Sequence, residues 1–296
     1  MSELLLVALA GFTASLVDGA LGMGFGPTSS SILLSTGLSP AGVSTTVNLA
    51  KVATGIAAAI SHWRFRNIDH RLVLQLAIPG SLGALIGVTV LANVDGDSLK
   101  PWIAGLLFLV GLRILFRFSR MPATAKIDVE EAEDLEHDPD RMPKFDERGV
   151  KVAATAGGVT NGLIGAWGPI VTPFLLHRGL TPRFAIGSVN TAEVAVAAIS
   201  AGSLIASVGS GTVDMAIVIA MLAGGIIAAP VAAWVIRYVP ARAMGLGVGA
   251  LLLATNGRDL ANLLDLGAAR WVVFFAIALV VAAAVFAPKL RHRLPA

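Results

Sequence analysis

The chain has 296 residues, of which 55% are hydrophobic and only 14% are charged, and its formal net charge is +3. Several stretches of about 20 residues carry no charge and are long enough to cross a bilayer as helices, so the composition predicts an all-α, polytopic membrane protein. The basic residues lie in short loops between apolar stretches, which argues against nucleic-acid binding. Cysteine is absent from the sequence, which excludes disulfides and thiolate chemistry.

The first apolar region, roughly 4–37, contains a glycine-rich interruption that ends at Gly26-Pro27. The only charged side chain ahead of it is Glu3, whereas a secretory signal begins with basic residues, so we expect a mature membrane segment. Proline suits the first turn of a helix, and the pattern therefore predicts a broken, re-entrant helical hairpin whose second arm starts at Pro27. Asp18 lies beside this break and could either carry a proton or cap the second arm.

Three uninterrupted spans follow, at about 40–61, 72–93 and 99–117. The first of them contains Lys51, whose charge is costly inside a bilayer unless it faces protein or water. Asn48 lies three residues before Lys51, so both side chains would share one face of the helix. This polar face indicates a functional position.

Residues 119–150 form the one segment with soluble character, because they contain ten acids, five bases and three prolines. This composition predicts a cytoplasmic linker. A calcium or regulatory site is the alternative, but the spacing of the acids does not match a twelve-residue calcium loop.

The rest of the chain repeats the first part. A second interrupted apolar region covers 151–180, and uninterrupted spans follow at about 184–206, 215–236, 241–260 and 269–288. Gly26-Pro27 returns 142 positions later as Gly168-Pro169, at the second interruption. Half-length repeats with glycine and proline breaks at matching positions are typical of transporters built from two related halves.

The charges of the loops predict how the two halves are oriented. If the C-terminus is cytoplasmic and the N-terminus periplasmic, 18 of the 22 Lys and Arg residues fall on the cytoplasmic side. A hairpin and three spans then start outside and end inside, so the second half must be inverted relative to the first. The predicted units are 1–118 for the first membrane repeat, 119–150 for the linker, 151–264 for the second, inverted repeat, and 265–296 for an extra transmembrane helix with a basic tail.

The two breaks are the predicted binding site. Each short helix that starts there would direct free N–H groups and the positive end of its dipole into the membrane interior, which favours an anion. The predicted substrate-binding residues are Gly26, Pro27, Thr28, Ser29, Asn48, Lys51, Gly168, Pro169 and Asn190. The alternative is that the glycines only allow close helix packing and the prolines only kink the helices.

Lys51 and Glu193 occupy equivalent positions in the two halves and have opposite charges. One interpretation is a buried ion pair that fixes the halves against each other. The functional interpretation is that Lys51 balances the charge of the substrate while Glu193 carries a coupling proton, with Asp18 as a second protonatable group. The histidines lack metal-ligand spacing, so we expect no metal and no cofactor.

The run from Val17 to Pro27, followed by Gly37-Leu38-Ser39-Pro40 and repeated in the second half, resembles the sulfite exporter TauE/SafE family over most of the chain apart from the linker. The resemblance implies a bacterial inner-membrane transporter for anions of sulfur metabolism, including sulfite and organosulfonates. The predicted function is a secondary transporter that exports such an anion by alternating access between two inverted repeats. Export is implied by the resemblance alone.

Other functions fit parts of the same pattern. An importer or channel for thiosulfate, sulfate, a carboxylate or another small solute would show the same repeats. An intramembrane hydrolase would need a second carboxylate beside Asp18, and the other clearly intramembrane acid is Glu193. A membrane scaffold would not need Lys51. The expected partners are a small anion and membrane lipid, with no nucleic acid, and the sequence leaves open whether the protein is a homodimer.

Overall fold

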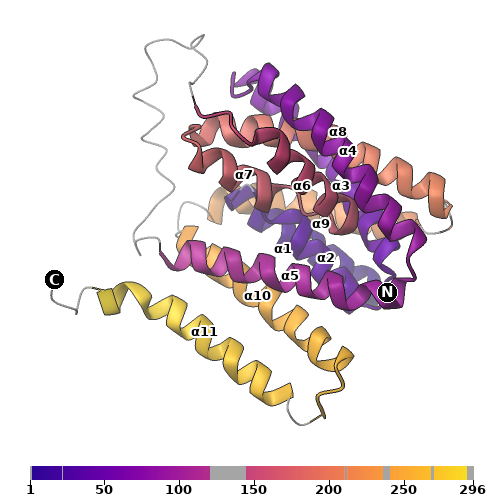
Figure 1. The fold of residues 1–296 in the computed structure, drawn as a ribbon, viewed down its shortest axis with the longest axis vertical. Coiled ribbons are helices and arrows are strands. Elements are labelled where there is room, and N and C mark those ends of the chain that lie inside the picture. Colours follow the sequence, from indigo (N-terminus) through magenta and orange to yellow (C-terminus); the bar gives the residue numbers. More distant parts are fainter. Residues whose placement is uncertain are drawn as a thin grey trace.

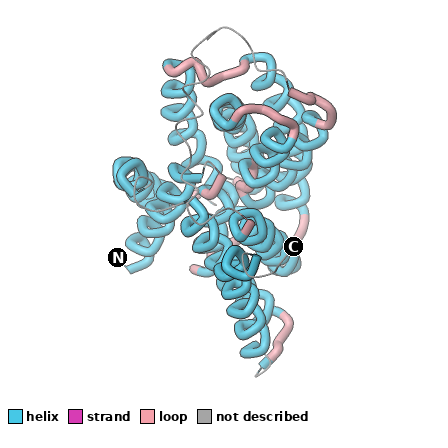
Figure 2. Tube along the Cα trace, turned by 90° about the vertical axis from the view of Figure 1, so that its left-hand side faces the viewer, coloured by secondary structure: helices cyan, strands magenta, loops and turns pink. Residues whose placement is uncertain are grey.

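The computed structural model describes residues 2–21, 23–120, 145–209, 211, 213–235, 241–267 and 270–291. Within these ranges the chain folds into eleven α-helices, with no strand (Figures 1 and 2). The predicted all-helical architecture is therefore confirmed. The helices are α1 (Ser2–Leu21), α2 (Phe25–Ser35), α3 (Pro40–Arg64), α4 (His70–Asn93), α5 (Gly96–Ser119), α6 (Val150–Ile164), α7 (Gly168–His177), α8 (Pro182–Val208), α9 (Met215–Val235), α10 (Ala241–Leu263) and α11 (Arg270–Arg291). Most of the predicted linker between α5 and α6 lies outside the described ranges.

Local sequence signals explain where the long helices begin. Ser39 caps α3 by accepting the N–H of Gly42 at 3.2 Å, and Pro40 occupies the first helical position. Asp69 caps α4 by accepting two backbone N–H groups at 2.9 and 3.0 Å. Each of the seven uninterrupted spans expected from the sequence is a helix whose ends lie within a few residues of the predicted ones.

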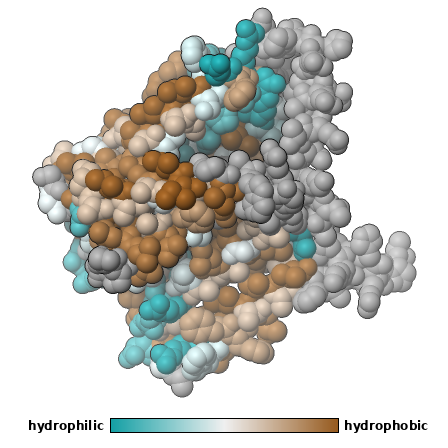
Figure 3. Space-filling model, turned by 180° about the vertical axis from the view of Figure 1, so that it is seen from behind, coloured by the Kyte–Doolittle hydropathy of each residue, from teal (hydrophilic) through white to brown (hydrophobic). Residues whose placement is uncertain are grey.

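Four of these helices are long and apolar enough to cross a membrane within the described ranges: α3, α4, α5 and α8. Shorter apolar stretches lie in α1 (Leu4–Leu16), α9 (Met215–Ala228) and α11 (Arg270–Val285). Hydrophobic residues cover much of the described surface on the face shown in Figure 3. Exposed hydrophobic side chains on α4 include Ile78, Leu82 and Ile86. A surface this apolar suits a hydrocarbon environment rather than water.

Both predicted breaks are present. α1 ends at Leu21 and α2 begins at Phe25, while α6 ends at Ile164 and α7 begins at Gly168. The first turn of each short helix contains the expected proline, Pro27 in α2 and Pro169 in α7.

The helices pack in pairs that join the two predicted halves. α1 packs against α9 and α6 against α4, while α3 packs against α8 and α5 against α10. α11 contacts α10 and α5 and lies at the edge of the bundle (Figure 1). The α1–α9 and α4–α6 pairs are close because glycine lets the backbones touch: a Cβ on Gly11 would lie 2.1 Å from the Met221 carbonyl oxygen, and one on Gly83 2.1 Å from that of Thr155.

Candidate functional site

The two helix breaks meet inside the bundle. A Cβ on Gly26, in the first turn of α2, would lie only 1.8 Å from the carbonyl oxygen of Gly165, which follows α6. Gly165 itself has a φ of 68°, and a Cβ there would lie 2.5 Å from Cγ1 of Val47. Ser30 Oγ donates to the carbonyl oxygen of Ile164 at 2.6 Å. Glycine is therefore required at both breaks, for contact at Gly26 and for both contact and conformation at Gly165.

Lys51 links the contact between the two breaks to Glu193 on α8. Its Nζ donates to the carbonyl oxygen of Gly165 at 2.5 Å, to Asn161 Oδ1 at 3.2 Å and to Glu193 Oε1. An ammonium group has three protons to donate, so all of them are used. The side chain of Lys51 is 6% exposed and that of Glu193 is 18% exposed. The two residues that the repeat made equivalent thus form an ion pair.

Asn161 is the centre of the surrounding network. Its Nδ2 donates to Asn48 Oδ1 at 2.7 Å and to Ser200 Oγ at 3.0 Å. Ser44 completes the network by accepting from Asn48 Nδ2 through its carbonyl oxygen at 2.9 Å. The only sequence signal for Asn161 was its place just before the second break.

The remaining predicted site residues differ in their surroundings. Ser29 Oγ donates to the carbonyl oxygen of Phe25 at 2.6 Å, so its hydroxyl proton is used in a hydrogen bond within α2. Thr28 Oγ1 is buried without a partner in the described structure. Asn190 is half-buried and forms no hydrogen bond with its side chain among the described residues. The first three residues of α7, Gly168 and Pro169 among them, are packed and partly or fully buried.

Asp18 accepts hydrogen bonds from the backbone at the start of α2. Its Oδ1 accepts the backbone N–H of Gly24 at 2.9 Å and of Phe25 at 3.2 Å. The carboxylate therefore caps α2 across the break and satisfies two N–H groups that a helix start leaves free. This contact favours the capping interpretation of Asp18.

A second polar cluster joins α2 to α10, and the sequence gave no sign of it. Ser31 Oγ lies 2.5 Å from Thr255 Oγ1, and Asn256 Nδ2 donates to Ser31 Oγ at 2.8 Å. Asn256 Oδ1 is buried with no described partner. The cluster joins the short helix α2 to α10 through hydroxyl and amide groups.

The chain is similar to known proteins over most of its length. A family model described as sulfite exporter TauE/SafE matches residues 7–258. The probable membrane transporter protein YtnM of Bacillus subtilis (strain 168) is 39% identical over 267 residues, which is 88% of this chain and 84% of that protein. No solved structure matches.

Proposed function

Because the chain belongs to the sulfite exporter TauE/SafE family and is a multi-pass membrane transporter, we propose that it exports a small sulfur-containing anion, sulfite or an organosulfonate, across the bacterial inner membrane. The observation that carries this proposal is a buried ammonium group, Lys51, held between two helix breaks. An oxyanion has several acceptor oxygens and suits N–H and O–H donors beside one cation.

The packing of the helices supports two inverted repeats. In the proposed transport cycle, these repeats open the binding site to one side of the membrane at a time. If α1–α5 correspond to α6–α10, the α1–α9 contact corresponds to the α6–α4 contact, and the α3–α8 and α5–α10 pairs correspond to themselves. This is the pattern that a pseudo-two-fold axis would generate. Lys51 and Glu193, 142 positions apart and in contact, would then lie beside that axis, near the membrane midplane where such transporters bind substrate.

The contacts of Lys51 suggest how substrate would bind. Its protons are all engaged, one of them by Glu193, so an anion can bind Lys51 only by replacing a present acceptor. Glu193 is the acceptor that a proton can neutralise. Protonation of Glu193 would release the ammonium group to the anion and keep a buried charge paired at each stage, which is the proposed basis of proton coupling.

The experiment that tests the site is the thermal stability of the purified protein in a series of sulfur oxyanions and carboxylates. A ligand that binds the folded state raises its apparent stability by mass action. We expect sulfite or a sulfonate to stabilise the wild type and the Lys100→Ala control, since Lys100 pairs with Asp97 at the surface. The K51M/E193Q variant removes both charges of the pair and should fold without responding to anions. An equal response in this variant would make Lys51 a structural residue.

The direction of transport needs its own measurement. Flux of radiolabelled sulfite from each face of oriented vesicles, with and without a pH gradient, separates export from import and from channel-like conduction. Export that proceeds only from the cytoplasmic face supports the proposal, whereas uptake alone would replace it by the importer that the same architecture permits.

A further inference from the structure

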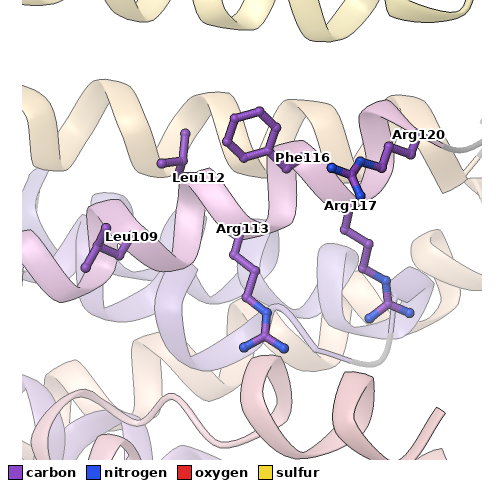
Figure 4. Close-up of a pocket in the computed structure, with 6 residues that line it drawn as sticks. All are labelled: Leu109, Leu112, Arg113, Phe116, Arg117 and Arg120. Carbon is purple, nitrogen blue, oxygen red and sulfur yellow. The ribbon is translucent and has the colours of Figure 1, made fainter. Parts of the chain in front are cut away.

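A basic groove lies on the C-terminal half of α5, outside the site at Lys51. Its volume is about 450 Å³, and it is lined by Leu109, Leu112, Arg113, Phe116, Arg117 and Arg120 (Figure 4). Arg113 and Arg117 are one helical turn apart, and Figure 4 shows their side chains extending from α5 in the same direction, whereas Phe116 and Leu112 project elsewhere. The arginines thus present two guanidinium groups side by side.

No described carboxylate forms an ion pair with Arg113, Arg117 or Arg120. Like charges one turn apart on a helix repel each other. Arg117 is half-buried and contacts the ring of Phe118, so its charge, which no described carboxylate balances, is more costly than that of the exposed Arg113 and Arg120. An anion between the guanidinium groups would relieve both the repulsion and the desolvation.

Arg117 also connects the groove to the transport site. Its Nη1 lies 3.7 Å from Sδ of Met23, which is in the break between α1 and α2. Gly26, three residues further on, is in contact with Gly165 and close to Lys51, because a Cβ on Gly26 would lie 3.3 Å from Lys51 Nζ. The groove therefore adjoins the segment that leads to the buried ammonium group.

We propose that this groove is a second oxyanion site, which captures the sulfur anion from the cytoplasm before it reaches Lys51. The inference rests on the proposed function and on the cytoplasmic placement of the end of α5. Arginine suits the task because its planar fork binds two oxygens of one oxyanion at once. Clustered positive charge raises the local concentration of an anion and its rate of arrival, and salt weakens this effect.

The headgroup of an anionic phospholipid also presents negatively charged oxygens, and Leu109 and Phe116 are exposed beside the arginines. The direction of Arg117, toward the helix break at Met23, favours the transported anion. The membrane composition in the experiment separates the two sources.

The test is sulfite efflux from the cytoplasmic face, measured in phosphatidylcholine vesicles at low and high salt. It compares the wild type with the Arg113→Gln/Arg117→Gln double variant and with Arg64→Gln, an exposed arginine at the end of α3. We expect the double variant to raise KM roughly tenfold, to keep kcat and to lose most of the salt dependence of KM, while Arg64→Gln behaves as wild type. The single Arg113→Gln variant, at an exposed position, gives the same readout if the double variant does not fold.

Three other results would overturn the inference. A double variant with unchanged KM, measured beside an inactive K51M/E193Q variant, removes the groove from the pathway and leaves the proposed function standing. A wild type that shows neither flux nor stabilisation with any sulfur oxyanion removes the proposed function, and the groove inference with it. An effect that appears only when the vesicles contain phosphatidylglycerol assigns the groove to the headgroup of an anionic phospholipid.

Discussion

At the scale of single residues, Lys51 is the side chain with the most unusual position. It is 6% exposed, it lies in a long apolar helix, and its charge is matched by one carboxylate, one amide oxygen and one backbone carbonyl. Breaking such a pair leaves an unpaired buried charge, whereas removing both charges together often costs little. Variants that remove one charge or both charges of the pair can therefore test its contribution to stability.

We expect Glu193→Gln to lower the free energy of unfolding by about 3–5 kcal/mol, because it leaves Lys51 with no negative partner. The K51M/E193Q double variant should recover most of this loss. Chemical unfolding in detergent measures both. A Glu193→Gln variant as stable as the wild type would show that the ion pair does not hold the halves together.

The same Glu193→Gln variant tests proton coupling. A glutamine cannot release a proton, so we expect anion binding to stay measurable while the dependence of flux on a pH gradient is lost. Flux in vesicles with imposed pH gradients is the measurement. If the flux of this variant still depends on the pH gradient, a group other than Glu193 carries the coupling proton.

At the scale of helices, the two breaks could be predicted from the sequence because they depend on local signals. Glycine and proline interrupt the apolar runs at Gly26-Pro27 and Gly168-Pro169, and the helices stop and restart there. The network around the breaks could not be predicted. Asn161 and Asn48 are 113 positions apart, and which faces of their helices meet depends on how the helices are rotated in the bundle.

Gly26→Ala should abolish folding or strongly destabilise the protein, since its Cβ would lie 1.8 Å from a backbone oxygen that cannot move aside easily. Gly105→Ala is the matched control, because a Cβ there meets nothing within 4 Å and alanine favours the helix by about 0.5–1 kcal/mol. Thermal unfolding of both variants checks the contrast. Equal melting temperatures would mean that the two breaks are not in contact.

Asp18 offers a test that distinguishes a helix cap from a proton carrier. Asn caps a helix as well as Asp does, so Asp18→Asn should keep both stability and the pH dependence of flux, whereas Asp18→Ala should lose about 1 kcal/mol. Loss of pH-gradient dependence in Asp18→Asn, with stability unchanged, would instead make Asp18 a protonatable group of the transport cycle.

At the scale of the whole molecule, the helices of the predicted halves are interleaved rather than adjacent. α1 packs on α9 and α4 on α6, so neither half buries its apolar surface by itself. The family match ends at residue 258, before α11, which lies at the edge of the bundle against α10 and α5. The site and the interleaved helices therefore fall almost entirely within the matched range.

The proposed orientation can be tested because the natural chain has no cysteine. Ser98 and Arg148 are both exposed, at the start of α5 and just before α6. A membrane-impermeant maleimide should label Ser98→Cys from the periplasmic side of intact cells and Arg148→Cys only in inverted vesicles. The opposite labelling pattern would reverse the topology and place the arginine groove on the outer face.

The Lys51–Glu193 contact also bears on how the two halves came to differ. In a dimer of identical chains, positions related by a two-fold axis carry the same residue, so two lysines or two glutamates would face each other there. Opposite charges at such a place require two halves of different sequence. In the proposed inverted repeat both halves belong to one chain, so each can carry its own residue, with the cation on one half and the acid on the other.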